Sequence, residues 1–294
     1  MIKRLIVILG PTASGKSDLA VNLAKKFNCE VISADSRQVY KGMDIGTGKV
    51  SKKEMKGVPH YLLDVASPKT IFTVAQYRKL ALKTINKILK KGKVPVLCGG
   101  TGFYIQAVID GIIIPKVKPD KQLRLSLNLL TAEELFKKLK ELDPRRAKNI
   151  ERKNKRRLIR ALEIVIKTKK PVPVLKKNPL PYPVLIIGVK KENIKELIRK
   201  RLLKRLEKGL VSEVKKLKKS GIPWLKLEEF GLEYRYISRY LQKKLTYQEM
   251  VEKLQKEIEH YAKRQMTWFK RNKRIYWIKK QPEAERLIKQ FLKE

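Results

Sequence analysis

The sequence predicts an α/β fold: a parallel sheet flanked by helices, with a helical insertion subdomain. Two patterns carry this prediction. Short apolar runs alternate along the chain with stretches of helical periodicity, which is the order of elements in a parallel sheet covered by helices. Between residues 115 and 153 the pattern is helical only, and the proline-rich stretch 170–183 follows before the next apolar run.

The predicted strands are short runs with continuous rather than alternating apolarity, which is typical of strands buried on both faces. They are residues 4–9, 30–33, 61–63, 94–98, 184–189 and 275–278. Helices are expected to begin at Gly15, near Thr73 and at Gly102, because helical sequence patterns follow each of these positions.

Two units are expected along the chain. The first is an α/β core, residues 1–116 and 182–294, which ends in basic helices. The second is a mainly helical insertion, residues 117–181, because leucines such as Leu127 and Leu135 recur at helical spacing and no strand pattern interrupts them.

Positive charge dominates the composition. The 294 residues include 71 Lys and Arg against 28 Asp and Glu, a formal net charge of +43, while 43% of the residues are hydrophobic. The hydrophobic share excludes a disordered chain, and the charge favours a polyanionic partner, nucleic acid before a membrane surface. A lysine-rich thermophile surface is the alternative, but such surfaces gain Glu together with Lys.

Cys29 and Cys98 each lie in an apolar run and are expected to be core residues. Together with His60 and His260 they do not give the spacing of a zinc motif. The chain passes directly from its first residues into a strand, and no apolar stretch reaches transmembrane length. We therefore expect no signal peptide, no membrane partner and a cytoplasmic location.

A phosphate-binding loop follows the first predicted strand. The stretch GPTASGKS matches G-x-x-x-x-G-K-[ST], and its position between a strand and a helix indicates a P-loop NTPase-like core. Its backbone N–H groups and Lys16 are expected to hold a diphosphate, and Ser17 is the expected ligand of a Mg²⁺ cofactor. The predicted diphosphate-binding residues are Gly10, Pro11, Thr12, Ala13, Ser14, Gly15, Lys16 and Ser17. The motif alone does not say which molecule carries the diphosphate.

Polar residues also follow the second and fourth strands, at the sheet edge where such folds bind ligands. Asp35, in ISADSRQVYKGMDIGTGK, is a candidate general base, although it could instead cap a helix that starts at Ser36. Thr101 follows Gly99 and Gly100, which either allow close backbone approach or only form a tight turn. Asp64 is a second acid that could assist Mg²⁺ or cap a loop, and the sequence does not decide between these roles.

The second half of the chain is rich in arginine. The stretch RRAKNIERKNKRRLIRALEIV places several arginines beside a helix whose apolar face includes Leu158 and Leu162, so it is either an RNA-binding edge or a solvated charged face. Arg201 and Arg205 lie one helical turn apart and could clamp a phosphate group. Aromatic residues lie among cations near the C-terminus, an arrangement that suits stacking on single-stranded nucleic acid, but for Trp268 and Phe269 the core is the favoured alternative.

Taken together, several blocks resemble the bacterial tRNA dimethylallyltransferase family, also called tRNA isopentenyltransferases or IPP transferases. The blocks are GPTASGKS, ISADSRQVYKGMDIGTGK, PHYLLD, VLCGGTGFYIQAV, RRLIRALEI and YAKRQMTWF, and they span residues 6–277. The resemblance implies transfer of the dimethylallyl group from dimethylallyl diphosphate to N6 of the adenine immediately 3′ of the anticodon, with diphosphate as the leaving group. The implied substrates are tRNAs that read codons beginning with U, and the family suggests a monomer.

The resemblance also implies roles for particular residues. Asp35 matches the family's general base, Thr101 a threonine at the reacting site, and Arg205 an arginine that binds diphosphate, although Arg201 could take that role. The helical insertion is expected to contact the tRNA anticodon stem-loop. The residues implied in tRNA contact are Asp35, Ser36, Arg37, Gln38, Thr101, Arg124, Arg156, Arg157, Leu158, Ile159 and Arg160.

One segment departs from the family pattern. Where the family reads close to A-I-G-Y-K-E, this chain keeps Gly231 but continues with Leu232 and Glu233, which could alter the anticodon-loop preference.

Three other functions compete with tRNA prenylation. A P-loop kinase would explain the loop but not the charge, an ATP-gated RNA-binding protein would leave Asp35 and Thr101 unused, and an adenylate isopentenyltransferase acting on free AMP or ADP would not need the basic surface.

Overall fold

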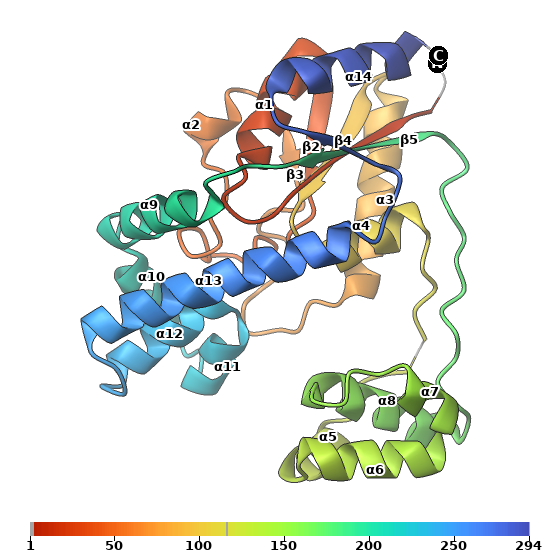
Figure 1. The fold of residues 1–294 in the computed structure, drawn as a ribbon, viewed down its shortest axis with the longest axis vertical. Helices are drawn as coiled ribbons and strands as arrows, with labels where there is room; N and C mark the ends of the chain where they lie inside the picture. Colours follow the sequence, from red (N-terminus) through yellow and green to blue (C-terminus); the bar gives the residue numbers. More distant parts are fainter. Residues whose placement is uncertain (1–2, 116, 294) are drawn as a thin grey trace. The chain divides into compact units, whose positions relative to one another are not determined.

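The computed structural model describes residues 3–115 and 117–293. They form two compact units, one made of the described residues up to Gly111 and from Pro179 onward, and the other of the described residues between Ile112 and Asn178. The boundaries predicted from the sequence were residues 117 and 181. Figure 1 labels the helices and four of the six strands.

The first unit is built on a six-stranded parallel sheet with the strand order β3-β2-β4-β1-β5-β6. Its strands are β1 (Leu5–Leu9), β2 (Cys29–Ser33), β3 (His60–Tyr61), β4 (Val94–Gly99), β5 (Val184–Val189) and β6 (Ile275–Ile278). The six predicted strands are confirmed, and the bounds of five of them agree with the prediction to within one residue at each end. The exception is β3, which begins one residue earlier than expected and ends at Tyr61, two residues earlier than expected. Leu62 and Asp64 adopt positive φ angles, which ends the strand.

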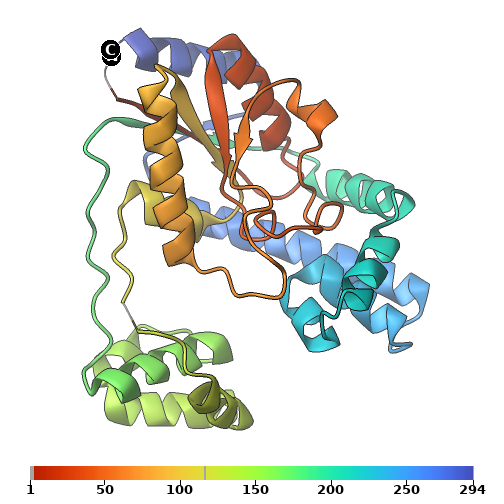
Figure 2. The ribbon, with the colours of Figure 1, turned by 180° about the vertical axis from the view of Figure 1, so that it is seen from behind.

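Helices cover both faces of this sheet because its side chains alternate between two apolar cores (Figure 2). On one face Ile6 and Ile8 pack with α1 (Lys16–Lys26) and α14 (Gln281–Lys293). On the other face Leu5 and Val7 belong to the core that includes α3 (Val74–Lys90) and α4 (Gly102–Ile109). As expected, α3 begins after Thr73, whose side chain forms a capping box with Gln76.

A group of helices extends this second core. Its members are α9 (Ile194–Glu207), α10 (Leu210–Lys219), α11 (Trp224–Glu229), α12 (Leu232–Leu241) and the long α13 (Tyr247–Phe269), and the short α2 (Lys52–Met55) lies after the β2 exit. Helices α9 and α13 share a small core that contains Leu202, Leu254 and Ile258. The packing fixes α9 and α13 relative to each other beside the loops that follow the strands.

The second unit contains α5 (Lys121–Leu129), α6 (Ala132–Leu142), α7 (Pro144–Lys148) and α8 (Lys155–Thr168). Its own core is formed by residues such as Leu135, Leu139, Leu158 and Leu162. A side-chain cap begins each of these four helices and satisfies a backbone N–H group in its first turn.

The chain leaves and re-enters the first unit at neighbouring points. The backbone N–H of Leu180 donates to the carbonyl of Ile109, with 3.3 Å between the two atoms. Within the described residues, no helix combines the length and apolarity needed to cross a membrane.

Candidate active site at the carboxyl edge of the sheet

The loop after β1 has the backbone of an anion cradle. Ala13 and Gly15 adopt left-handed conformations, with φ angles of 61° and 79°, and α1 begins directly afterwards at Lys16. Such alternation turns successive N–H groups toward one concave side, where the helix N-terminus adds positive potential. Ser14 Oγ is buried and has no hydrogen-bond partner among the described residues, so the loop holds a donor that an incoming anion can satisfy.

Three cationic side chains influence one another at this loop. Lys16 Nζ donates to the carbonyl of Pro11 at 3.1 Å. Burial, together with the charge of Arg201, lowers the pKa of Lys16 to about 8. Burial and the neighbouring charge of Arg205 likewise lower the pKa of Arg201 to about 10. Because neighbouring positive charges contribute to the lowered pKa values of Lys16 and Arg201, a polyanion bound at this site would be strongly stabilised.

Arg201 and Arg205 project from α9 onto the loop after β2. A methyl group added at Gly48 would collide with both guanidinium groups. Arg205 Nη1 is paired with Glu233 Oε1 at 3.0 Å and donates to the carbonyl of Gly46 at 3.3 Å, whereas Arg201 makes no hydrogen bond or ion pair within the described part of the chain. Glu233, the departure from the family pattern, therefore touches the arginine expected at the diphosphate.

Asp35 holds a turn at the end of β2. Its Oδ1 accepts hydrogen bonds from the backbone N–H groups of Arg37 and Gln38 at 2.8 and 3.3 Å. The alternative that Asp35 caps a helix is wrong, because residues 36–39 form a turn and no helix follows until α2. Within the described structure Oδ2 makes no hydrogen bond, so half of the carboxylate is available to a ligand.

Thr101 joins the exits of β4 and β2. It is the residue before α4, and its Oγ1 accepts a hydrogen bond from the N–H of Ser36 at 3.0 Å. Its own N–H donates to the carbonyl of Ala34 at 3.1 Å. Of the two alternatives for the glycines, the structure supports close backbone approach, because a methyl group added at Gly99, the last residue of β4, would collide with the carbonyl oxygen of Ala34. This approach brings the hydroxyl of Thr101 next to Ser36, the residue that follows Asp35.

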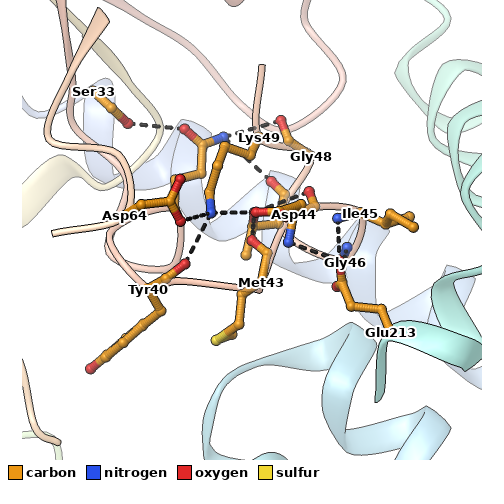
Figure 3. A network of polar contacts seen from close by, with 12 residues as sticks. Ser33, Tyr40, Met43, Asp44, Ile45, Gly46, Gly48, Lys49, Asp64 and Glu213 are labelled. Carbon is orange, nitrogen blue, oxygen red and sulfur yellow. Dashed lines mark hydrogen bonds and ion pairs between the residues drawn. The ribbon is translucent and has the colours of Figure 1, made fainter. Parts of the chain in front are cut away.

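Residues 44–49, which follow the turn at Asp35, form a loop that is held by a polar network (Figure 3). Glu213 of α10 accepts hydrogen bonds from the N–H groups of Asp44, Ile45 and Gly46 at 2.8, 2.6 and 3.0 Å. Tyr234 of α12 donates to the same carboxylate at 2.8 Å. Loop 44–49 is thus anchored to two helices on one side while Arg201 and Arg205 lie against it on the other.

Lys49 and Gln38 complete this network. Lys49 Nζ is buried and contacts Asp44 Oδ1 and Asp64 Oδ1, both at 2.5 Å, and the carbonyl of Tyr40 at 2.9 Å (Figure 3). Asp64 is therefore part of the loop anchor. The amide of Gln38 accepts from Ser33 Oγ at 2.9 Å and donates to the carbonyl of Gly48 at 3.1 Å, so a direct RNA contact by this side chain would require these bonds to break.

In the second unit the predicted tRNA contacts fall into two groups. Arg124 makes a bidentate pair with the buried carboxylate of Glu163, both contacts at 2.7 Å, and Arg160 also binds it. Burial alone would raise the pKa of Glu163, but hydrogen bonds from Arg124, Arg160 and the N–H of Asp120 outweigh it and lower the pKa to about 2. These two arginines hold the unit together.

The other predicted contacts lie at the start of α8. Leu158 and Ile159 bury their side chains in the core of the second unit, at 0% and 9% exposure, so these two side chains are not presented at the surface where RNA would bind. Arg156 and Arg157, in contrast, are exposed. The first turn of α8 thus presents two arginines outward on a helix that is anchored by two apolar residues.

The core assignments made from the sequence are confirmed. Cys29 and Cys98 are buried free thiols, and burial raises the pKa of each to about 12. Phe269 is buried, and Trp268 packs against the same core with its ring close to Gly102.

Sequence reasoning missed the contributions of Glu213 and Gln265. In the sequence, Glu213 is one of several charged residues on an amphipathic helix, and nothing nearby indicates its backbone partners, which lie at residues 44–46. Gln265 gave a signal that could have been used, because it is a polar residue on the apolar stripe of α13, where the other buried residues include Ile258, Ala262 and Phe269.

Comparison with known proteins gives consistent results. A family model described as IPP transferase matches residues 38–272. The chain is 43% identical over 297 residues to a tRNA dimethylallyltransferase of Acetivibrio thermocellus, with 97% of this chain and 95% of the relative covered. It is also 43% identical over 288 residues to tRNA dimethylallyltransferase 1 of Syntrophus aciditrophicus, covering 95% of this chain and 94% of the relative.

Solved structures are similar over most of the chain. The tRNA isopentenylpyrophosphate transferase of Bacillus halodurans matches with a TM-score of 0.71 and 38% identity, covering 94% of this chain and 90% of that one. A eukaryotic dimethylallyltransferase described as acting on tRNA matches with a TM-score of 0.75 and 26% identity, and the match covers 94% of this chain and 74% of that one. The chain therefore belongs to the IPP transferase family of prenyl-transferring enzymes.

Proposed function

We propose that this enzyme transfers the dimethylallyl group of dimethylallyl diphosphate to N6 of the adenine immediately 3′ of the anticodon in tRNA. The observation that carries the proposal is the meeting of two sites at one sheet edge, a cationic anion cradle after β1 and the Asp35–Thr101 pair of loops after β2 and β4. The names of the relatives support the same donor and acceptor. Because the acceptor is tRNA, we place the reaction in the cytoplasm.

The cradle residues suit the departure of diphosphate. Breaking the allylic C–O bond places positive charge on carbon and further negative charge on the leaving group. Lys16, Arg201 and the loop N–H groups lie at the cradle before the reaction, so they can stabilise this developing charge. Arg205 can add to this stabilisation when the diphosphate competes with Glu233 for its guanidinium group.

Asp35 and Thr101 suit activation of the acceptor. The exocyclic amine of adenine is a weak nucleophile because its lone pair is conjugated with the ring, so it must be held close to the allylic carbon. The open Oδ2 of Asp35 can accept a proton from N6 as the new C–N bond forms, and Thr101 can help to hold the base. The adenine has to leave the anticodon loop stack to reach this site, which costs least in a single-stranded loop.

The donor set around Ser17 fits Mg²⁺ bound mainly by the substrate. Mg²⁺ commonly takes one or two protein oxygens and completes its shell with phosphate oxygens and water. Ser17, the second residue of α1, supplies a hydroxyl beside the cradle, and no cluster of three acidic, histidine or cysteine side chains occurs within residues 3–115 and 117–293. A magnesium ion held there would neutralise charge on the leaving diphosphate.

Transfer can be tested directly with unmodified tRNA that carries adenosine next to the anticodon. The purified protein is incubated with this tRNA, dimethylallyl diphosphate and Mg²⁺, and the nucleosides are then analysed by mass spectrometry. We expect adenosine to gain one prenyl unit while diphosphate is released and added ATP remains intact. ATP hydrolysis or phosphorylation of a small molecule without any prenylated nucleoside would refute the proposal and favour a P-loop kinase. Single adenosine-to-guanosine changes in the loop check the position of the modified base.

The exposed arginines of α8 are proposed to contact tRNA phosphates. Changing Arg156 and Arg157 together to alanine should weaken binding of an anticodon stem-loop RNA. It should also reduce the slope of log K against log salt by about 1 to 2, because each phosphate contact contributes about 0.7 to 0.9. Fluorescence anisotropy at several salt concentrations measures both. Alanine at Lys137 and Lys138, exposed cations on α6, is the matched control, and an unchanged slope in the arginine variant would place Arg156 and Arg157 away from the RNA.

A further inference from the structure

Helix α13 buries one amide among apolar side chains. Its buried face consists of Met250, Leu254, Ile258, Ala262, Gln265 and Phe269. Gln265 is only 7% exposed. A buried amide without partners is costly, so a glutamine on this stripe needs polar partners inside the protein.

Both partners of Gln265 lie in loops at the active-site edge. Its Oε1 accepts a hydrogen bond from the backbone N–H of Thr12 at 2.8 Å. Its Nε2 donates to the carbonyl of Gly100, also at 2.8 Å. Thr12 belongs to the cradle after β1, whereas Gly100 belongs to the exit of β4. A single side chain therefore bridges two loops that are far apart in sequence.

Gly100 lies in close contact with the amide of Gln265. A methyl group added at Gly100 would lie 2.6 Å from Nε2, and it would lie 3.6 Å from Cε of Lys16. The amide and the lysine side chain are thus both packed against this glycine. The N–H of Thr12, occupied by Gln265, is not available to a phosphate, so the bridge also selects which N–H groups of the cradle remain free.

The bridge continues to the acceptor side. Gly100 precedes Thr101, whose hydroxyl accepts the N–H of Ser36, the residue after Asp35. The hydrogen-bonded chain therefore begins in the loop expected to hold the leaving group and ends beside the expected base. A displacement of about 1 Å between reacting groups can reduce a rate about 100-fold, so the length of this chain matters for transfer.

We propose that Gln265 is a positioning residue that sets the distance between the diphosphate cradle and the Thr101–Asp35 side of the site. This inference rests on the proposed prenyl transfer. Gln265 acts through Thr12 and Gly100, and it does not touch either substrate.

The first test is Gln265→Met, which keeps the length of the side chain and removes both hydrogen bonds. We expect kcat for prenyl transfer, per correctly folded molecule, to fall by about 100-fold. The dissociation constants for pyrophosphate with Mg²⁺ and for an anticodon stem-loop RNA should stay within a few-fold of wild type. Gln248→Met, an exposed change on the same helix, is the control and should leave kcat unchanged. A purely structural role would lower the melting temperature and the folded fraction but would not lower kcat per folded molecule.

Gln265→Glu gives a second readout that remains usable if the methionine variant does not fold. A protonated carboxyl group can accept from Thr12 N–H and donate to the Gly100 carbonyl, whereas a carboxylate can only accept. The ratio of kcat for Gln265→Glu to kcat for wild type should therefore rise as the pH falls. Lys16, which packs against Gly100, titrates in both proteins, so only the ratio is informative.

The outcomes separate this inference from the proposed function. If wild type does not prenylate tRNA, the proposed function fails. If wild type does so and Gln265→Met has the same kcat, or if pyrophosphate affinity falls as much as kcat, positioning by Gln265 is refuted. A pH-independent ratio for Gln265→Glu would refute it as well.

Discussion

Replacing Asp35 by asparagine should lower the rate constant for prenyl transfer by about 100- to 10,000-fold, the usual contribution of a general base. Asparagine keeps an oxygen at Oδ1, so the hydrogen bonds from Arg37 and Gln38 and the turn itself should survive. What disappears is the basic Oδ2, which is the atom open to the substrate. Single-turnover prenylation with saturating donor and tRNA measures the chemical step.

Two controls make the Asp35 result interpretable. Asp110→Asn removes a carboxylate that pairs with Arg274 at the end of α4, and it should leave the transfer rate close to wild type. Binding of the anticodon stem-loop to Asp35→Asn should stay within a few-fold. A large loss of RNA binding with a normal rate at saturation would show that Asp35 recognises RNA and does not act as the base.

Pyrophosphate binding should weaken as the pH rises through the pKa of Lys16, about 8 in the free enzyme. Below that pKa the lysine carries the proton that the diphosphate needs, and above it the proton must be taken up during binding, which costs free energy. Because the bound anion favours the charged form, the pKa should rise in the complex and protons should be taken up near pH 8. Calorimetry in buffers with different ionisation enthalpies measures this uptake.

Lys16→Met should reduce pyrophosphate affinity by about 10- to 100-fold, since a hydrogen bond to a charged group is lost. It should also abolish the proton uptake, whereas Lys25→Met, at an exposed position of the same helix, should preserve both. If the pyrophosphate affinity of wild type does not change as the pH passes through the pKa of Lys16, this lysine does not bind the diphosphate.

The fold was largely predictable because the signals that define it are local. Buried parallel strands are continuous apolar runs, the loop that ends at Ser17 has a recognisable glycine spacing, and Thr73 carries a capping signature. The strand β3 was misplaced because it has only two residues, His60 and Tyr61, and its end depends on backbone conformations that propensity does not reveal.

The site was predictable only in part, since many of its contacts join distant segments. The motif positions identified Asp35, Thr101 and Lys16, but not the bridge from Gln265 to Thr12 or the carboxylate of Glu213 beneath loop 44–49. For Leu158, one of the residues implied in tRNA contact, the sequence already indicated a buried side chain, because its helical spacing placed it on the apolar face of α8.

The hydrogen bond between Leu180 and Ile109 also bears on how the fold tolerates changes in the helical segment. The chain leaves and rejoins the first unit at adjacent points. The segment Ile112–Asn178 therefore lies in the connection between α4 and β5 and does not interrupt any strand of the sheet. Insertions are tolerated at such places because the ends they must join are already close. A change in the length of the helical segment between α4 and β5 would therefore leave all six strands and their order intact.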